Sequence, residues 1–189
     1  MLLLGIGGQI MNINSFFYCL ALFASIANPL YAMQAAIPAN WYEYARSQGL
    51  QNPVKVEVEN LTSNLILVVY KKGAANEGNY GYDMVQNGKT MQIVYGIPGA
   101  IPFPQFIVKT KNIIYILDFE PKAGGGFKAT LSRSGATDII DPTTSTQEMM
   151  QLAIVAERQT IEQTDINLGD VITIVVKEDG ARLSITKRQ

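Results

Sequence analysis

The sequence predicts a mainly β fold: an antiparallel β-sandwich or partly closed barrel of about eight strands, with a short N-terminal helix and a second helix near 146–163. Three observations carry this prediction. Residues 54–59 alternate between apolar and charged side chains, and residues 65–70 are apolar at every position. Two Asx-Gly pairs, Asn87-Gly88 and Asp179-Gly180, separate further strand-like segments and indicate tight hairpin turns.

The N-terminal residues predict a signal peptide. Residues 1–32 carry no Lys, Arg, Asp or Glu and contain an apolar run, 16–27, which has signal-peptide length and is too short to span a bilayer. Ala32 is a small residue at the expected cleavage position, and Met11 is an alternative start. An uncleaved, anchoring N-terminus is the alternative interpretation. Export would place the protein in the periplasm or outside the cell.

Residues 33–189 are expected to form a single β-rich domain, because a chain of this length supports one core. They hold all 15 basic and all 16 acidic side chains, and this near balance gives no electrostatic reason to bind nucleic acid. Membrane contact stays open. Cys19 is the sole cysteine and precedes the expected cleavage site, so the mature domain can form no disulfide.

Residues 35–49 predict a short helix. Asn40 and Glu43 have the spacing of a capping box, and Gly49 suits the position just after the last helical turn. The first turn is crowded with aromatic side chains: Trp41, Tyr42 and Tyr44. These aromatics either dock the helix on the sheet or form a patch that binds a sugar or a partner protein.

Residues 52–73 predict a β-hairpin around which the other strands are arranged. Its first strand places three valines on one face and three charged residues on the other: Val54, Val56 and Val58 against Lys55, Glu57 and Glu59. Its second strand, 65–70, is expected to be central, because a strand without polar positions is buried on both faces. Residues 61–64 supply the turn, and the glycosylation sequon at Asn60 is interpreted as a chance match.

Residues 80–95 predict a second hairpin, because Asn87-Gly88 is typical of a type I′ turn. A two-residue loop fixes the strand pairs: Gln86 with Lys89, Met84 with Met91, Tyr82 with Ile93 and Tyr80 with Tyr95. The last three pairs share one apolar face. Tyr80, Tyr82 and Tyr95 are therefore expected in the core.

Residues 96–104 combine three prolines with apolar side chains and are expected to form a loop, because proline cannot donate to a ladder. The loop either covers the end of the core or binds a partner through Ile97, Ile101 and Phe103. Three successive strands are expected after it: residues 105–110, 113–120 and 127–133.

Residues 147–163 predict a helix, because strong helix formers dominate the first half and Ser145 with Glu148 has capping-box spacing. A pair of strands is the alternative, since some apolar residues there also alternate. A final hairpin is predicted over 165–187, with Asp179-Gly180 as its turn. Its expected pairs are Val176 with Leu183, Ile174 with Ile185 and Thr173 with Thr186.

Missing residue types exclude several chemistries. The chain has no histidine, which rules out histidine-based nucleophile systems and imidazole metal sites, and the mature part has no thiolate. Asp118 and Glu120 lie two apart on a predicted strand and point to one face, the arrangement of a carboxylate hydrolase or a Ca²⁺ site. A solvent-facing strand surface is the simpler interpretation. We expect no catalytic residue, metal or cofactor.

These features predict an exported, non-catalytic interaction or structural protein of the bacterial cell envelope, such as a subunit of a larger assembly. A protein partner is expected, and the candidate binding residues are Trp41, Tyr42, Tyr44, Ile97, Ile101 and Phe103. The alternative is a secreted ligand-binding module that recognises a glycan or a membrane. A hydrolase using Asp118 and Glu120 is a third hypothesis.

Cleavage after Ala32 can be tested by expressing the full chain in a bacterium with an active secretion pathway. The exported protein is expected to begin at Met33, because the small side chain of Ala32 suits the peptidase. N-terminal sequencing or intact mass measures this directly. Exported protein that still begins at Met1 or Met11 would contradict the prediction.

Overall fold

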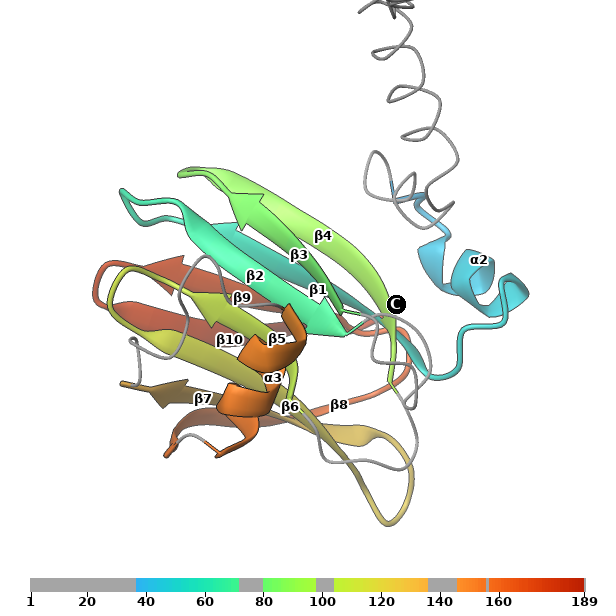
Figure 1. The fold of residues 1–189 in the computed structure, drawn as a ribbon. Helices are drawn as coiled ribbons and strands as arrows, with labels where there is room; N and C mark the ends of the chain where they lie inside the picture. The colour runs from blue at the N-terminus through green and yellow to red at the C-terminus, as the bar shows by residue number, and fades with distance from the viewer. Residues whose placement is uncertain (1–36, 72–79, 98–103, 136–145, 156, 189) are drawn as a thin grey trace, which may run out of the picture. The chain divides into compact units, whose positions relative to one another are not determined.

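The structure is a β-sandwich with few helices, as the sequence predicts. The computed structural model describes residues 37–71, 80–97, 104–135, 146–155 and 157–188, all within one compact unit, Ile37–Gln189. These residues form two helices and ten strands, in two packed sheets that do not close into a barrel (Figure 1). The predicted signal peptide, residues 1–32, lies outside the described residues.

The smaller sheet has four strands in the order β10-β9-β1-β4. Their bounds are β1 Pro53–Asn60, β4 Lys89–Gly96, β9 Val171–Lys177 and β10 Gly180–Thr186. β1 is antiparallel to β4 but parallel to β9, so the sheet is mixed. The alternation predicted along β1 is confirmed, with fully buried valines between partly exposed charged residues: Val54, Val56 and Val58 against Lys55, Glu57 and Glu59.

The larger sheet has six antiparallel strands in the order β3-β2-β5-β6-β7-β8. Their bounds are β2 Ile66–Lys71, β3 Tyr80–Val85, β5 Pro104–Lys109, β6 Ile114–Pro121, β7 Phe127–Ser134 and β8 Gln159–Ile166. The predicted succession of strands over 105–133 is confirmed as β5, β6 and β7. β2 lies inside the sheet, as predicted. Val68 faces the inter-sheet core and Val69 faces the opposite side, so β2 is buried on both faces.

Apolar side chains pack in two layers. Between the sheets, the ring of Phe106 lies 5.1 Å from that of Tyr95 and 6.4 Å from that of Phe119, centroid to centroid. On the outer face of the larger sheet, helix α3 (Thr146–Val155) covers the strands (Figure 1). Its buried residues pack on three isoleucines and a valine: Met149, Met150 and Ala153 on Val69, Ile107, Ile114 and Ile116.

The hairpin predicted over 52–73 is wrong. Its two strands form, but β1 belongs to the smaller sheet and β2 to the larger one. The segment between them, 61–65, crosses from one sheet to the other instead of folding back. β1 pairs with β4 and β9 instead, so its partners are distant in sequence.

The hairpin predicted over 80–95 is also wrong. β3 pairs with β2 in the larger sheet, whereas β4 pairs with β1 in the smaller one. A type I′ turn needs a positive φ at both central residues, yet Asn52 is the only non-glycine with positive φ among the described residues. Gly88 has a φ of 68°, and Asn87 lies outside that region. The turn therefore lacks the twist that would pair its flanking strands.

Two of the crossovers between the sheets, from β1 to β2 and from β3 to β4, meet at the side chain of Asn60, which is fully excluded from solvent. Its Nδ2 donates to the carbonyl of Asn64, at 2.8 Å, and to that of Val85, at 2.7 Å. Its Oδ1 accepts from the N–H and the hydroxyl of Thr62. Its backbone carbonyl accepts from the N–H of Gly88 at 2.7 Å. One residue therefore ties the end of β1 to both chain crossings.

The helix predicted over 147–163 is correct only in its first half. α3 ends at Val155, and residues 159–166 form strand β8, which pairs with β7. Arg158 lies between them and donates to the carbonyl of Ala153, where it satisfies an acceptor at the helix end. The residues after Arg158 include Thr160, Ile161 and Thr164, whose β-branched side chains favour the strand.

The C-terminal hairpin is confirmed, but its register differs from the prediction by two residues. Val176 pairs with Ala181 and Ile174 pairs with Leu183, so the loop consists of Glu178 and Asp179. Glu178 accepts a hydrogen bond from the N–H of Ser63 at 2.5 Å, which holds it in the loop. A shift of two residues keeps every side chain on its predicted face.

Replacement of Asn60 by alanine is expected to lower the free energy of unfolding by about 3 kcal/mol, because the carbonyl of Val85 and the N–H and hydroxyl of Thr62 lose a buried partner. Asn64→Ala is the matched control and should cost less than about 0.5 kcal/mol, because its side chain is exposed. Urea unfolding of both variants measures the difference. Equal losses would show that Asn60 does not stabilise the crossovers.

Candidate functional site

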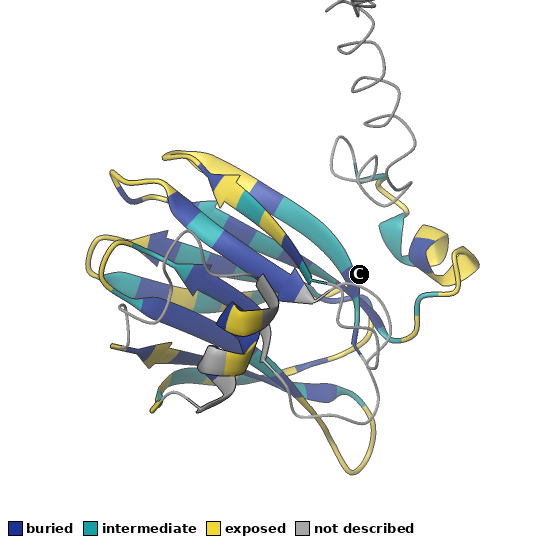
Figure 2. Cartoon of the chain, in the orientation of Figure 1, coloured by how far each residue is buried: buried dark blue, intermediate teal, exposed yellow. Residues whose placement is uncertain are grey.

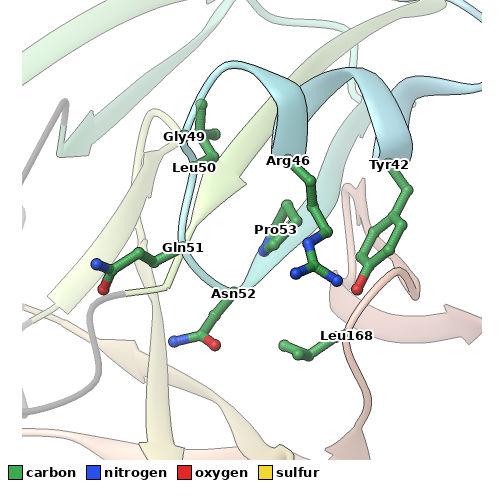
Figure 3. A pocket seen from close by; sticks show the side chains of 8 residues that line it. All are labelled: Tyr42, Arg46, Gly49, Leu50, Gln51, Asn52, Pro53 and Leu168. Carbon is green, nitrogen blue, oxygen red and sulfur yellow. The ribbon is translucent and has the colours of Figure 1, made fainter.

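A pocket of about 380 Å³ opens beside helix α2 (Trp41–Ser47), as Figure 3 shows. Its walls come from three segments: the helix, the loop that leads into β1, and the turn between β8 and β9. The lining residues are Tyr42, Arg46, Gly49, Leu50, Gln51, Asn52, Pro53 and Leu168. Aromatic, cationic, amide and apolar groups therefore meet in one opening.

Helix α2 ends where the sequence predicts. The N–H of Leu50 donates to the carbonyl of Ala45 and that of Gly49 to the carbonyl of Arg46, which together form a Schellman motif. Gly49 has a φ of 80°, the left-handed conformation that this position requires. The predicted capping box is wrong, because the Asn40 side chain makes no capping hydrogen bond. The C-terminal end of α2 is thus the better-defined one, and it borders the pocket.

Tyr42 is held from several sides. The guanidinium of Arg188 lies 4.1 Å from its ring centroid, and the ring of Trp41 meets it edge-on at 5.8 Å. Gly169 lies so close that an added Cβ would stand 3.2 Å from the tyrosine ring. The ring is therefore fixed, and its hydroxyl extends toward the opening of the pocket (Figure 3).

Asn52 fixes the loop opposite the helix. Its side-chain amide donates to the carbonyl of Ile97 at 3.0 Å, and its own carbonyl accepts from the N–H of Ile97 at 3.1 Å. Its φ of 48° is left-handed, a conformation that asparagine tolerates better than most residues. These two bonds hold one wall of the pocket against the end of β4.

The charges near the pocket are paired, except at Arg46. Arg188 forms an ion pair with Glu43, and Lys187 lies 2.9 Å from Asp170. Burial of Asp170 opposes its ionisation, but hydrogen bonds from Asn167, Lys187 and Arg188 outweigh burial and lower its pKa. Arg46 forms no ion pair with any residue that the structure describes. Its guanidinium extends into the pocket from the exposed last turn of α2 (Figure 3).

The four described residues among those predicted to bind a partner do not form one exposed patch. Trp41 and Tyr42 are half-buried, Tyr44 is 39% exposed, and Ile97 is buried in the core. Ile97 therefore belongs to the alternative in which the loop covers the core. Ile101 and Phe103 lie outside the described residues.

Asp118 and Glu120 have different surroundings although they share a strand face. Asp118 is partly buried, and its Oδ2 accepts a hydrogen bond from Nη1 of Arg158 at 2.7 Å. Burial raises its pKa, the charge and hydrogen bond of Arg158 oppose this rise, and Glu120 adds to it; the pKa remains above its usual range. Glu120 is exposed. The ion pair links the end of α3 to the sheet, which supports a structural role for Asp118.

Edge strand β3 carries exposed positions, drawn yellow in Figure 2. Two large apolar side chains on this strand are exposed, Tyr82 at 58% and Met84 at 55%. Their strand neighbours on β2 are Val69 and Leu67, so both point to the outer face of the larger sheet. The expectation that Tyr80 and Tyr82 lie in the core with Tyr95 is wrong, since it rested on the incorrect hairpin: Tyr80 is half-buried and packs on the outer face of the larger sheet. Tyr95 is buried as expected.

Sequence reasoning missed Arg46, Leu168 and the edge position of β3. Arg46 follows Tyr42 by four residues on a helix, which alone signals that the two side chains are neighbours. The sequence predicts that Leu168 precedes a turn at Gly169-Asp170, but it carries no signal that this turn lies beside α2.

No protein-family model matches this chain, and no curated protein matches it either. Within the residues that the structure describes, no helix is long and apolar enough to cross a membrane. In the same part of the chain, no three Cys, Asp or Glu residues lie close enough together to hold a metal ion.

The stability of the wild type relative to Asp118→Asn is expected to increase as the pH falls from neutral toward about 4. A raised pKa means that the folded state favours the protonated carboxyl. The contribution of the protonated Asp118 carboxyl to the free energy of unfolding is complete below its pKa in the unfolded chain, and it is lost as the pH rises through its pKa in the folded protein. Urea unfolding at several pH values measures the trend.

Arg158→Gln is expected to enlarge this dependence on pH, because the guanidinium that opposes the rise in pKa is removed. A wild type that loses stability relative to Asp118→Asn on acidification would contradict the assignment.

Proposed function

We propose that this protein is an exported, non-catalytic interaction protein of the bacterial cell envelope that binds a protein partner along strand β3. The observation that carries the proposal is the exposed apolar face of β3, where Tyr82 and Met84 each expose more than half of their surface. Exposed aromatic and methionine side chains are enriched where proteins bind one another.

The position of β3 supports a partner that adds a strand. β3 ends the described larger sheet, and the backbone of an edge strand offers N–H and C=O groups to another chain. Tyr82 and Met84 are two residues apart and share one face, so a paired strand could bury both.

The other three edges carry polar exposed residues, which natural sheets use to discourage pairing. These are Lys89 and Thr90 on β4, Gln159, Thr160, Gln163 and Asp165 on β8, and Arg182, Ser184 and Thr186 on β10. The contrast singles out β3. A non-catalytic role is further supported by the lack of histidine and of any cysteine after Cys19.

The proposal is tested by co-purification from the native envelope under mild conditions. The amount of partner that co-purifies with the double variant Tyr82→Ser, Met84→Ser is expected to be at least about tenfold lower than with the wild type, as for loss of an interface hot spot. Quantitative mass spectrometry of the eluates measures the retained partner.

Tyr44→Ser is the matched control, because Tyr44 is also an exposed tyrosine but lies on α2. It should retain the partner. Loss of the partner with Tyr44→Ser but not with the β3 variant would overturn the assignment to β3. A wild type that purifies without any partner would overturn the proposed function.

A further inference from the structure

We propose that the pocket beside α2 binds an organic carboxylate that carries an apolar group, with Arg46 as the residue that recognises the charge. This inference concerns a surface other than β3 and does not depend on the partner proposed there. Its ligand could be a free small acid or the C-terminal carboxylate of a peptide, which share this chemistry.

Within the described part of the chain, the pocket is lined by a cation, Arg46, and by no acidic residue. Glu43 is paired with Arg188, and Asp170 is paired with Lys187, so both acidic groups near the pocket are occupied. Arg46 is left with no ion partner among the described residues, and it lines the opening. A guanidinium presents a planar fork of donors that suits a carboxylate.

The hydroxyl of Tyr42 is a second hydrogen-bond donor beside the guanidinium of Arg46. Tyr42 and Arg46 are four residues apart on α2 and are therefore neighbours on one face. Figure 3 shows the tyrosine hydroxyl and the guanidinium extending toward the same opening. The hydroxyl is held there because Arg188 and Trp41 pack on the ring. A carboxylate could accept from both groups.

Part of the pocket wall is apolar. Leu168 exposes 38% of its surface, although it lies at the pocket with Leu50 and Pro53. An apolar ligand group would cover this leucine. Glycan recognition by stacking is disfavoured, because the Tyr42 ring already holds the Arg188 guanidinium at 4.1 Å and lies against Gly169.

The wall opposite the helix is fixed before any ligand arrives. The two hydrogen bonds between Asn52 and Ile97 hold the loop, and the Schellman motif at Gly49 holds the helix end. A preformed site loses less entropy on binding than one that has to order. A fragment-sized acid is therefore expected to bind in the millimolar range.

Trp41 provides the readout, because it is the only tryptophan in the chain and its ring lies 5.8 Å from that of Tyr42. Titration of the exported protein with N-acetyl-leucine is expected to change its fluorescence saturably. N-acetyl-leucinamide, which lacks the carboxylate, should bind at least about tenfold more weakly. Equal binding of acid and amide would overturn the proposal.

Arg46→Gln should weaken binding of the acid about tenfold or more, whereas Arg182→Gln, an exposed arginine on β10, should leave it unchanged. Tyr42→Phe removes the hydroxyl alone and should weaken binding several-fold, which keeps the test valid if Arg46→Gln unfolds. Unchanged binding in Arg46→Gln and Tyr42→Phe, or no saturable signal in the wild type, would overturn the proposal.

A short peptide ending in leucine identifies the source of the carboxylate. Tighter binding of the free-acid peptide than of N-acetyl-leucine supports a peptide C-terminus, and weaker binding supports a small free acid. Binding of the amidated peptide as tight as that of the free acid would count against carboxylate recognition.

Discussion

The architecture depends on one buried polar side chain. Two of the passages of the chain between the sheets, from β1 to β2 and from β3 to β4, come together at the end of β1, and their backbone carbonyls at Asn64 and Val85 need donors. Asn60 meets them with the two donors of a single amide, while its oxygen accepts from Thr62. A buried amide with every group satisfied specifies one geometry, whereas apolar packing tolerates several. Strand β1 thus ends at a point that determines where β2 and β4 begin.

The crossings also decide which surfaces are available for binding. If β3 and β4 formed a hairpin, Tyr82 would pair with Ile93 and lie in the core. Instead, β4 joins β1, and β3 becomes the outer strand of the other sheet with its apolar side chains facing solvent. The exposed tyrosine is a product of topology more than of composition. The pocket likewise depends on topology, since the β8–β9 turn reaches α2 only because β9 lies beside β1.

Local patterns predicted nearly every strand but not how the strands pair. Alternation along β1 and the continuous apolar run in β2 report burial of each strand, which is a local property. Strand pairing is not a local property. Asn87-Gly88 has the sequence of a hairpin turn, yet the N–H of Gly88 donates to the carbonyl of Asn60, more than twenty residues away. The end of the helix at Val155 was not predicted for a similar reason: residues 159–166 pair with β7, which is distant in sequence from the helix start. At the pocket, the sequence identified Tyr42 but could not place Arg46 and Leu168 beside each other.

The parallel pairing of β1 with β9 has a consequence for how the chain reaches its fold. Residues that meet across this pair lie more than a hundred positions apart, as Glu57 and Thr173 do. Contacts between such distant residues slow folding, because a long loop has to close before they form. On a growing chain, the backbone edge of β1 that pairs with β9 stays unpaired until residues 171–177 have been made. The smaller sheet therefore stays incomplete while more than a hundred residues after β1 are made, and that edge is exposed to competing partners for the same period.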